Sequence, residues 1–465
     1  MRKLISIVAL SFFLCGCPRT SQYVRPGLPV PSNWPDGSAA AAGAPGAPAA
    51  GDLKWREFFT DQRLQSVIDL ALANNRDLRV AALNIERFQA LYQIQRAELY
   101  PTVAASAGGD AYRVPENLSG SDHAKTVAQY TVGLGTASWE LDLFGRIRSL
   151  KSRALEQYLA TEQARAAAQI SLIAAVANSY LALAADREGL KLAQVTLDAQ
   201  QASYELILRT AEFGMASDLD LRQAQSQVEA ARVDIARYSG LVALDENALN
   251  LLVGTPVTTG LLAEDMSKVG DFREVAPGLP SDVLLRRPDI LAAEHQLKAA
   301  NANIGAARAA FFPRVALTAA AGITSSDLTN LFKPAAGTWN FAPQVTLPIF
   351  DSGARQANYN ASQVERDIAI ADYEKSIQAA FREVSDALSL RTALMSQQIA
   401  LQSLVDALAE TYRLSEARYT AGIDGYLSVL VAQRSLYGAQ QLLVDVRLAR
   451  LSNLVTLYKV LGGGA

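Results

Sequence analysis

An internal duplication constrains the fold of this chain more than any other feature. The segment QRAELYPTVAA (95–105) returns as ARAAFFPRVAL (307–317). Two pairs lie 212 residues apart, Asp77 with Asp289 and Pro101 with Pro313. Later pairs lie 208 apart: Tyr204 with Tyr412, Gly214 with Gly422, Gln225 with Gln433, and Gly254 with Gly462. The chain is thus a tandem repeat over about 60–254 and 280–462. The second copy is four residues shorter between Pro101 and Tyr204.

Each copy has the same predicted order of elements, beginning with a helix and a pair of strands. The helices are expected over about 62–99 and 288–311, because Pro101 and Pro313 cannot continue a helix. Strands should follow at 102–114 and 128–144 in the first copy and at 315–323 and 337–350 in the second. The loops 115–127 and 324–338 hold Pro, Asn, Ser, Asp and Gly, which is typical of hairpin connections.

Long helices come next in each copy. Residues 149–212 and 354–420 contain no proline, and roughly 64 residues at 1.5 Å each span about 95 Å. Gly214 and Gly422 should end these helices and lead into return helices over 217–253 and 427–461. The run 166–185 is weakly apolar, but four polar residues interrupt it, so we do not expect it to cross a membrane: Gln169, Ser171, Asn178 and Ser179.

The segment 337–350 alternates with a period of two, as strands do. Trp339, Phe341 and Val345 share one face with Leu347 and Ile349, whereas small and amide residues occupy the other. Such a strand fits a lipid-facing barrel with a wet interior, and it also fits a soluble sheet with one buried face. A membrane sheet cannot leave its edges unpaired, and single-chain barrels start at eight strands. Four strands per chain would therefore need two chains or three to close a barrel.

The N-terminus indicates export. Residues 1–16 have a basic start and an apolar run of about eleven residues, which fits a signal peptide and is too short to span a bilayer. Leu14 to Cys17 look like a lipobox, with cleavage before Cys17 and lipid attachment to its thiol; an ordinary signal cleaved nearby is the alternative. Residues 17–54 would form an extended, lipid-anchored segment, rich in Pro, Ala and Gly.

Composition excludes several classes of function. A net charge of −3 without a basic stripe argues against nucleic-acid binding. Two His and two Cys leave little material for a metal site, and His123 lies in a hairpin loop whereas His295 lies in a helix. The four Met form no cluster, which argues against soft-metal sites in the chain but leaves metal ions open as cargo. No Ser-His-Asp set, zinc spacing or phosphate-binding glycine loop occurs. We therefore expect neither an enzyme nor a cofactor, apart from the lipid on Cys17.

Two long segments carry a family resemblance. WREFFTDQRLQSVIDLALANNRDL (55–78) and GLPSDVLLRRPDILAAEHQLKAANANIGAARAAFFPRVAL (278–317) closely resemble TolC-like outer membrane factors, in their lipoprotein (NodT-like, OprM-like) branch. PQVTLPIFDSGARQA (343–357) and ARYTAGIDGYLSVLVAQRSL (417–436) also fit. The resemblance covers essentially the whole mature chain. The matching residues are Trp55, Phe59, Asp61, Asn75, Asp77, Leu279, Pro280, Arg287, Pro288, Asp289, Ala300, Asn301, Arg308, Phe312 and Pro313.

The resemblance implies an α+β membrane protein that works as a homotrimer. Three duplicated protomers would give a 12-stranded β-barrel in the outer membrane on a 12-helix α-barrel in the periplasm. The repeats would occupy 55–270 and 271–465. A periplasmic adaptor protein and an inner membrane pump, commonly of the resistance-nodulation-division type, would be its partners, with outer membrane lipid around the barrel.

The resemblance also implies side chains that close the duct near Gly214 and Gly422. Tyr419, Leu427 and Arg434 match the closing positions, and Asp218 and Asp220 lie at the corresponding turn of the first copy. Relatives often carry Asp three residues before the arginine, where this chain has Val431, and some carry Asp at Ser428. The closing contacts are then either weaker, or Asp218 and Asp220 supply the carboxylate. Each charge could equally be a solvated helix end, and Leu427 simple packing.

The resemblance favours a passive duct in a tripartite efflux pump that exports drugs or other small toxic compounds. The same architecture serves polypeptide (type I) secretion, and a purely structural periplasmic lipoprotein is a third possibility. The lipobox and the RRPDI block favour the efflux branch, and the hairpin strands count against a structural role. The cargo is not readable from the sequence, because in such systems the pump selects it.

Overall fold

The computed structural model describes residues 23–34, 50–120, 122–269, 272–273, 275–276 and 283–463. The predicted signal peptide 1–16, Cys17, and much of the segment 17–54 lie outside the described residues, as do Leu279 and Pro280 of the resemblance. The chain forms two compact units, and each draws on both repeats. One unit contains the strands with the helix segments next to them, and the other contains most of the helical structure.

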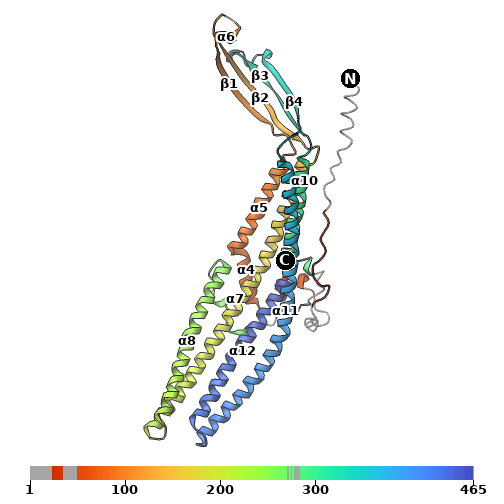
Figure 1. Cartoon of the computed structure of the whole chain (residues 1–465). Helices are drawn as coiled ribbons and strands as arrows, with labels where there is room; N and C mark the ends of the chain where they lie inside the picture. The colour runs from red at the N-terminus through yellow and green to blue at the C-terminus, as the bar shows by residue number, and fades with distance from the viewer. Residues whose placement is uncertain are drawn as a thin grey trace. The chain divides into compact units, whose positions relative to one another are not determined.

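The two copies fold into the same sequence of elements (Figure 1). The long helices begin and end within a few residues of their predicted limits. The first copy contains α4 (Gln62–Asn74), α5 (Arg76–Ala97), β1 (Ala104–Val114), β2 (Lys125–Leu141), α7 (Arg146–Glu212) and α8 (Asp218–Val253). The second contains α10 (Pro288–Ala309), β3 (Arg314–Ser325), β4 (Gly337–Thr346), α11 (Ala354–Thr420) and α12 (Tyr426–Val460). Short helices lie at α3 (Trp55–Phe58) and, in the β1–β2 loop, α6 (Glu116–Ser119).

The single helix predicted over 62–99 is wrong: two helices meet at Asn75. Its backbone is extended there, with φ −60° and ψ 131°, and its carboxamide oxygen accepts a hydrogen bond from the Leu78 N–H at 2.8 Å. A side chain that caps the next helix competes with the helical hydrogen bonds of its own residue, which explains the break.

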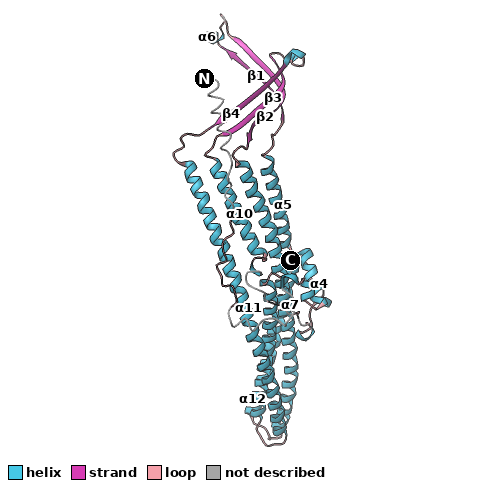
Figure 2. Ribbon diagram, turned by 90° about the vertical axis from the view of Figure 1, so that its right-hand side faces the viewer, coloured by secondary structure: helices cyan, strands magenta, loops and turns pink. Residues whose placement is uncertain are grey.

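The four strands form one antiparallel sheet in the order β1-β2-β3-β4 (Figure 2). The predicted strand 337–350 was too long, because β4 ends at Thr346 and leaves Leu347 and Ile349 outside the ladder. Pro348 has no N–H to continue the pairing. Pro343 lies inside β4, opposite Leu317, and an edge strand tolerates it.

Two pairs of glycines show how closely the copies agree. Gly214 and Gly422 end the two long helices with φ of 72° and 70°, and Gly254 and Gly462 follow the return helices with φ of 81° and 84°. Only glycine adopts such left-handed conformations without strain. The spacing of 208 therefore reflects a left-handed glycine at the same two turns of both copies.

α7 is long and apolar enough to cross a membrane by length and composition, and it is the one such helix in the described part of the chain. Half of the most apolar stretch of α7 is buried inside the protein. The core helix of a soluble protein can be equally long and apolar, so this burial agrees with a helix that packs against its neighbours.

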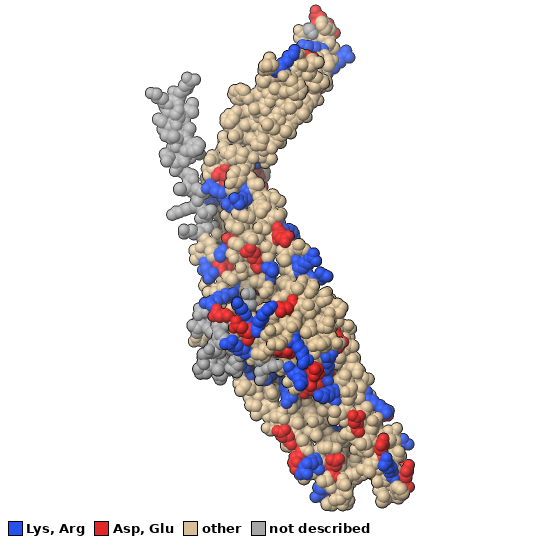
Figure 3. All heavy atoms as spheres, turned by 180° about the vertical axis from the view of Figure 1, so that it is seen from behind, with Lys and Arg blue, Asp and Glu red and all other residues tan. Residues whose placement is uncertain are grey.

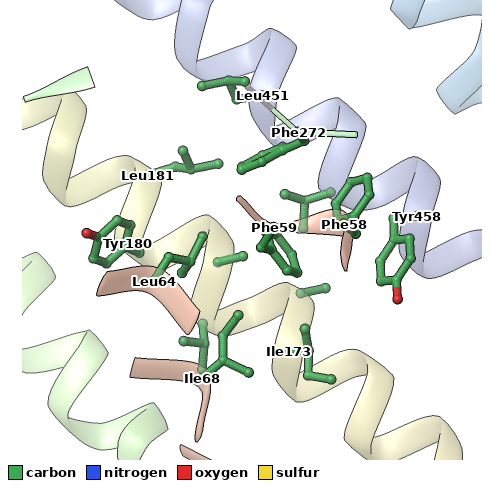
Figure 4. Close-up of a cluster of buried hydrophobic side chains, with 14 of the residues drawn as sticks. Phe58, Phe59, Leu64, Ile68, Ile173, Tyr180, Leu181, Phe272, Leu451 and Tyr458 are labelled. Atoms are coloured by element: carbon green, nitrogen blue, oxygen red, sulfur yellow. The ribbon is translucent and has the colours of Figure 1, made fainter. Parts of the chain in front are cut away.

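Aromatic rings form the centre of the helical unit (Figure 4). Phe58 is fully buried and stacks on Tyr458 with ring centroids 4.1 Å apart, and Phe59 and Phe272 pack around it. The Tyr458 hydroxyl donates a hydrogen bond to the Leu53 carbonyl at 2.7 Å. The short helix α3 is thus fixed against α12, the last helix of the second copy.

In each repeat, one hydrogen bond joins the start of a helix to the end of the return helix. In the first copy the Asn75 amide donates to the Leu252 carbonyl at 2.8 Å, near the end of α8. At the equivalent position of the second copy, the Arg287 guanidinium donates to the Val460 carbonyl at 2.8 Å. Each donor precedes a helix start, and each acceptor belongs to a return-helix end that lacks helical donors. Arg287 is also paired with two carboxylates, Asp289 at 2.7 Å and Glu383 at 2.9 Å.

Two carboxylates face each other where α7 packs on α8. Burial, together with the hydrogen bond and charge of Asp186, raises the pKa of Asp245 to about 6. Burial also raises the pKa of Asp186, while Arg237 opposes this shift and Asp445 of α12 adds to it. On the next residue of each helix, Arg187 and Glu246 form an ion pair at 2.7 Å.

Replacing Asp245 with Asn should flatten the pH dependence of stability. The folded state binds this proton more tightly than the unfolded chain, in which Asp titrates near 3.9. The stabilisation is therefore present at low pH and is lost as pH rises through about 6. Thermal unfolding at pH 5 and pH 8 checks this. If the variant keeps the pH dependence of the unmodified protein, the raised pKa of Asp245 beside Asp186 is contradicted.

Candidate functional site: sheet faces, sheet edges and helix turns

The strand register gives the sheet one polar and one apolar face. Residues paired directly across strands point to the same face. One row across the four strands reads Ser106, Gly133, Gly322 and Thr338. The row beside it, on the opposite face, reads Ala105, Leu134, Ala321 and Trp339. The Thr131 and Thr324 hydroxyls lie 3.0 Å apart on the first face, so polar groups meet there.

The outer edges of the sheet are open. β1 pairs only with β2, and β4 only with β3, so each has one unpaired side. Nearly every residue of both strands is exposed, including Trp339 (78%) and Phe341 (59%). A soluble sheet would bury such side chains or protect such edges. This combination suits a surface completed by lipid on one face and by further strands at the edges.

Exposed apolar and aromatic residues gather at both ends of the strands. About ten residues separate the two groups along a strand, or roughly 33 Å. Barrels in membranes carry such girdles at both interfaces. At the end next to the helices lie Tyr100, Phe311, Phe312, Ile349 and Phe350, and at the loop end lie Tyr112, Leu118, Leu328 and Phe332.

Charged side chains follow the same division. On the face in Figure 3 they are spread over the helices and are scarce over the sheet, except at its loop end. Near the helix end of the sheet, Glu140 pairs with Arg314 at 2.6 Å and with Arg146 at 2.8 Å. The middle of the sheet therefore offers little that would resist burial in lipid.

The α7–α8 turn is held by its own backbone and caps. Ser217 caps α8, and its side chain exchanges hydrogen bonds with Asp220: the Ser217 hydroxyl donates to the carboxylate at 2.7 Å and accepts from the Asp220 N–H at 3.1 Å. Asp218 is exposed in the first turn, where a negative charge favours the helix dipole. Local structure thus accounts for Asp220, whereas the Asp218 carboxylate is open to solvent.

The α11–α12 turn carries an ion pair that the sequence analysis missed. Arg418 lies in the last turn of α11 and donates two hydrogen bonds to the Asp424 carboxylate, at 2.6 and 3.1 Å. The hydrogen bond from Arg418 lowers the pKa of Asp424. The first turn has Thr210 and Ala216 at the equivalent positions, so only the second carries this bridge.

Tyrosines join the two turns. Tyr419 contacts Tyr426 edge to face, with centroids 5.6 Å apart, in a cluster that includes Ile207 of α7 and Ala224 of α8. Burial raises the pKa of Tyr419, and the charge of Asp220 raises it further. The structure therefore brings Tyr419 and Asp220, two of the predicted closing residues, into one neighbourhood.

The other predicted residues lie along the outside of α12. Leu427 and Val431 are each 57% exposed, and Arg434, one turn further, is exposed as well. Within the described part of the chain, Arg434 has no ion-pair partner. A stripe of two apolar residues and a cation, open in a single protomer, is suited to contact with another chain or with water.

Comparison with known proteins identifies the family. Residues 67–255 and 279–463 match the family described as outer membrane efflux protein. The chain belongs to the outer membrane efflux protein family. It is similar to the toluene efflux pump outer membrane protein TtgC of Pseudomonas putida, with 48% identity over 463 residues, 100% of this chain and 96% of the relative. OprJ of Pseudomonas aeruginosa is 41% identical over 461 residues, 99% of this chain and 95% of the relative.

Solved structures agree with this assignment. The open-state MtrE outer membrane channel of Neisseria gonorrhoeae is similar with a TM-score of 0.88 and 39% identity, covering 96% of this chain and 98% of that one. A membrane protein from Pseudomonas aeruginosa reaches 0.91 and 40%, with the same coverage. This outer membrane efflux protein thus has the TolC-like fold, in which duplicated halves supply long helices and four antiparallel strands. It is a channel component, and not an enzyme.

The described residues of this efflux protein contain no group of three or more His, Cys, Asp or Glu side chains that could hold a metal ion. His295 lies 2.6 Å from the Glu156 carboxylate, joining α10 to α7.

Sequence reasoning missed the Arg418–Asp424 bridge and the Asn75 and Arg287 hydrogen bonds. All four residues lie in segments that resemble the family. Asn75 and Arg287 also lie 212 residues apart, the repeat spacing, which could have indicated that they make equivalent contacts.

Proposed function

We propose that three copies of this chain form one duct, a 12-stranded barrel in the outer membrane continued by 12 helices in the periplasm. The open edges of β1 and β4 carry this proposal. Every backbone N–H and C=O within lipid needs a partner, so β1 of one protomer must pair with β4 of the next. Three four-stranded sheets close into a barrel with the even strand number that bacterial barrels have.

We propose that the duct serves an efflux pump as the exit for small toxic compounds. TtgC is named for a toluene efflux pump, and another Pseudomonas putida relative, ArpC, for an antibiotic efflux pump. Organic solvents and antibiotics are therefore the candidate cargo. A periplasmic adaptor and an inner membrane pump of the resistance-nodulation-division type would complete the assembly. The exposed Phe213, Met215 and Ile423 at the helix turns offer an apolar surface for the adaptor.

Conductance in a planar bilayer tests this function. The purified protein should give ion-conducting steps once the closing contacts are weakened, whereas a structural lipoprotein would give none. A crosslinked pull-down distinguishes the kinds of transport. An adaptor with a resistance-nodulation-division pump is the expected result, and an ATP-driven transporter with a secreted polypeptide would replace efflux by secretion.

We further propose lipid attachment at Cys17, after removal of residues 1–16, with a tether over 17–54 and repeats over 55–270 and 271–465. Replacing Cys17 with Ser should remove the lipid and leave part of the protein in the outer membrane, because the barrel also inserts. The mass of the N-terminal peptide and membrane fractionation measure both effects. A complete loss from membranes would show that the barrel alone does not hold the protein there.

We propose that Tyr419, Leu427 and Arg434 close the duct between neighbouring protomers, with acid supplied by Asp218 or Asp220. The exposed stripe on α12 supports this, and the position of Asp220 beside Tyr419 favours that carboxylate. Replacing Arg434 with Ala should raise single-channel open time and the entry of large antibiotics. The contacts of an exposed charge are worth about 1 kcal/mol, so a change of a few fold is expected. Unchanged conductance and entry would refute the closing role.

A further inference from the structure

Buried side chains recur every seven residues on α7, at Ala193, Gln200 and Ile207. On α12 the same spacing joins two buried side chains, Tyr426 and Gln433, to the half-buried Gln440. The helices run antiparallel, and such spacing marks the seam of a coiled coil. Pairing the two sets in opposite directions gives three rungs: Ala193 with Gln440, Gln200 with Gln433, and Ile207 with Tyr426. The outer rungs have independent support. Gln440 lines the same cleft as Leu192 and Val195, and Ile207 and Tyr426 share one buried cluster.

Only the middle rung is polar on both helices. Gln200 is 3% exposed and Gln433 is 7% exposed. Among the residues that the structure describes, neither side-chain carbonyl oxygen has a hydrogen-bond partner. A buried carbonyl without a donor costs free energy, so two of them on opposite helices at one level require an explanation.

We propose that Gln200 and Gln433 hold one water molecule between them, and that this hydrated rung is where the two helix hairpins part when the duct opens. Two carbonyl oxygens are acceptors, and a water molecule has two O–H donors to serve both. Buried waters occupy such polar sites in proteins. The water joins the two side chains and so holds α7 to α12. When the helices separate, further water can bind the same polar groups, so separation at this level costs less than at an apolar one. The second part of this inference rests on the duct function proposed above.

The duplication supplies a matched control. Gln225 of α8 is the counterpart of Gln433 at the spacing of 208. It is half-buried, and its carbonyl oxygen accepts a hydrogen bond from Arg222 at 2.8 Å. A glutamine at this position is therefore tolerated in both copies, but only the second copy places it in the seam.

Hydrogen exchange of the peptide 426–440 tests the rung in the full-length protein. Gln433→Leu or Gln200→Leu alone should leave the other glutamine carbonyl buried without a hydrogen-bond donor. Amide exchange in 426–440 should then become about tenfold faster. The double variant, apolar on both sides, should exchange no faster than the unmodified protein. Gln225→Leu should change nothing. If each single Leu variant slows exchange, and the two effects add, the carbonyls share no water and the inference is overturned.

Conductance tests the second part separately. The double variant should open less often than the unmodified protein, by several fold, because its seam no longer hydrates. An unchanged opening frequency would refute the role of the rung in opening. If the unmodified protein itself conducts nothing, the proposed duct fails, while the exchange experiment still decides whether the glutamines are coupled.

Discussion

Replacing Arg287 with Ala lowers the free energy of unfolding of the helical unit by about 3 kcal/mol, the largest loss we expect from a single polar side chain. Removing one partner of a buried ion pair typically costs about 3–5 kcal/mol. Arg287 is 7% exposed and holds the Val460 carbonyl as well as two carboxylates. The lower end of the range applies, because Asp289 and Glu383 are almost half exposed and can be hydrated without it.

Asn75 is the matched control, because it makes the equivalent contact in the first copy with one amide and no charge. Asn75→Ala should cost about 1–2 kcal/mol, the value of its hydrogen bond and its cap. Denaturant unfolding followed by helical circular dichroism measures both variants. Equal losses for the two variants would show that the carboxylate pairs of Arg287 contribute nothing, which would contradict this account.

Phe58→Ala should destabilise the same unit by about 3–5 kcal/mol. A phenyl ring removed from a packed core leaves a cavity in addition to the lost burial. Phe58 is 0% exposed and touches three other rings, those of Phe59, Phe272 and Tyr458. Because Phe58 belongs to α3 and Tyr458 to α12, the loss should also loosen α3 from α12 (Figure 4).

Phe213→Ala is the control for the cavity. The same side chain is removed, but Phe213 is 78% exposed in the α7–α8 turn. The unfolding midpoint of this variant should therefore stay within experimental error of that of the unmodified protein. Protease susceptibility of the segment 50–60 would report the loosening of α3 in the Phe58 variant. Similar stability losses in both phenylalanine variants would mean that the ring cluster is not the core of this unit.

Periodicity and duplication predicted much of the fold. The limits of α7, α8, α11 and α12 followed from the absence of proline and from Gly214 and Gly422, since these signals act on the local backbone. The strands were found where residues alternate. β4 was predicted four residues too long, because Leu347 and Ile349 keep the alternation after Pro348 has ended the pairing.

Side-chain contacts between distant segments were not readable. Asn75 looks like an ordinary helix residue, and its role depends on Leu252 and on the backbone of Leu78. Arg287 was noted as a family residue, but two of its three partners, Glu383 and Val460, lie 96 and 173 positions away. At the turns, Asp424 belongs to a quoted motif, yet its pairing with Arg418 depends on how the turn closes. Such contacts form only when the whole chain packs.

The number of chains in the native particle tests the central claim most directly. Native mass spectrometry of the protein, extracted from outer membranes in mild detergent, gives this number without any variant. The account predicts three copies per particle. The open edges of β1 and β4 exclude a single chain, and the resemblance to TolC-like outer membrane factors implies three copies and not two. A particle of one or two copies would contradict the 12-stranded duct.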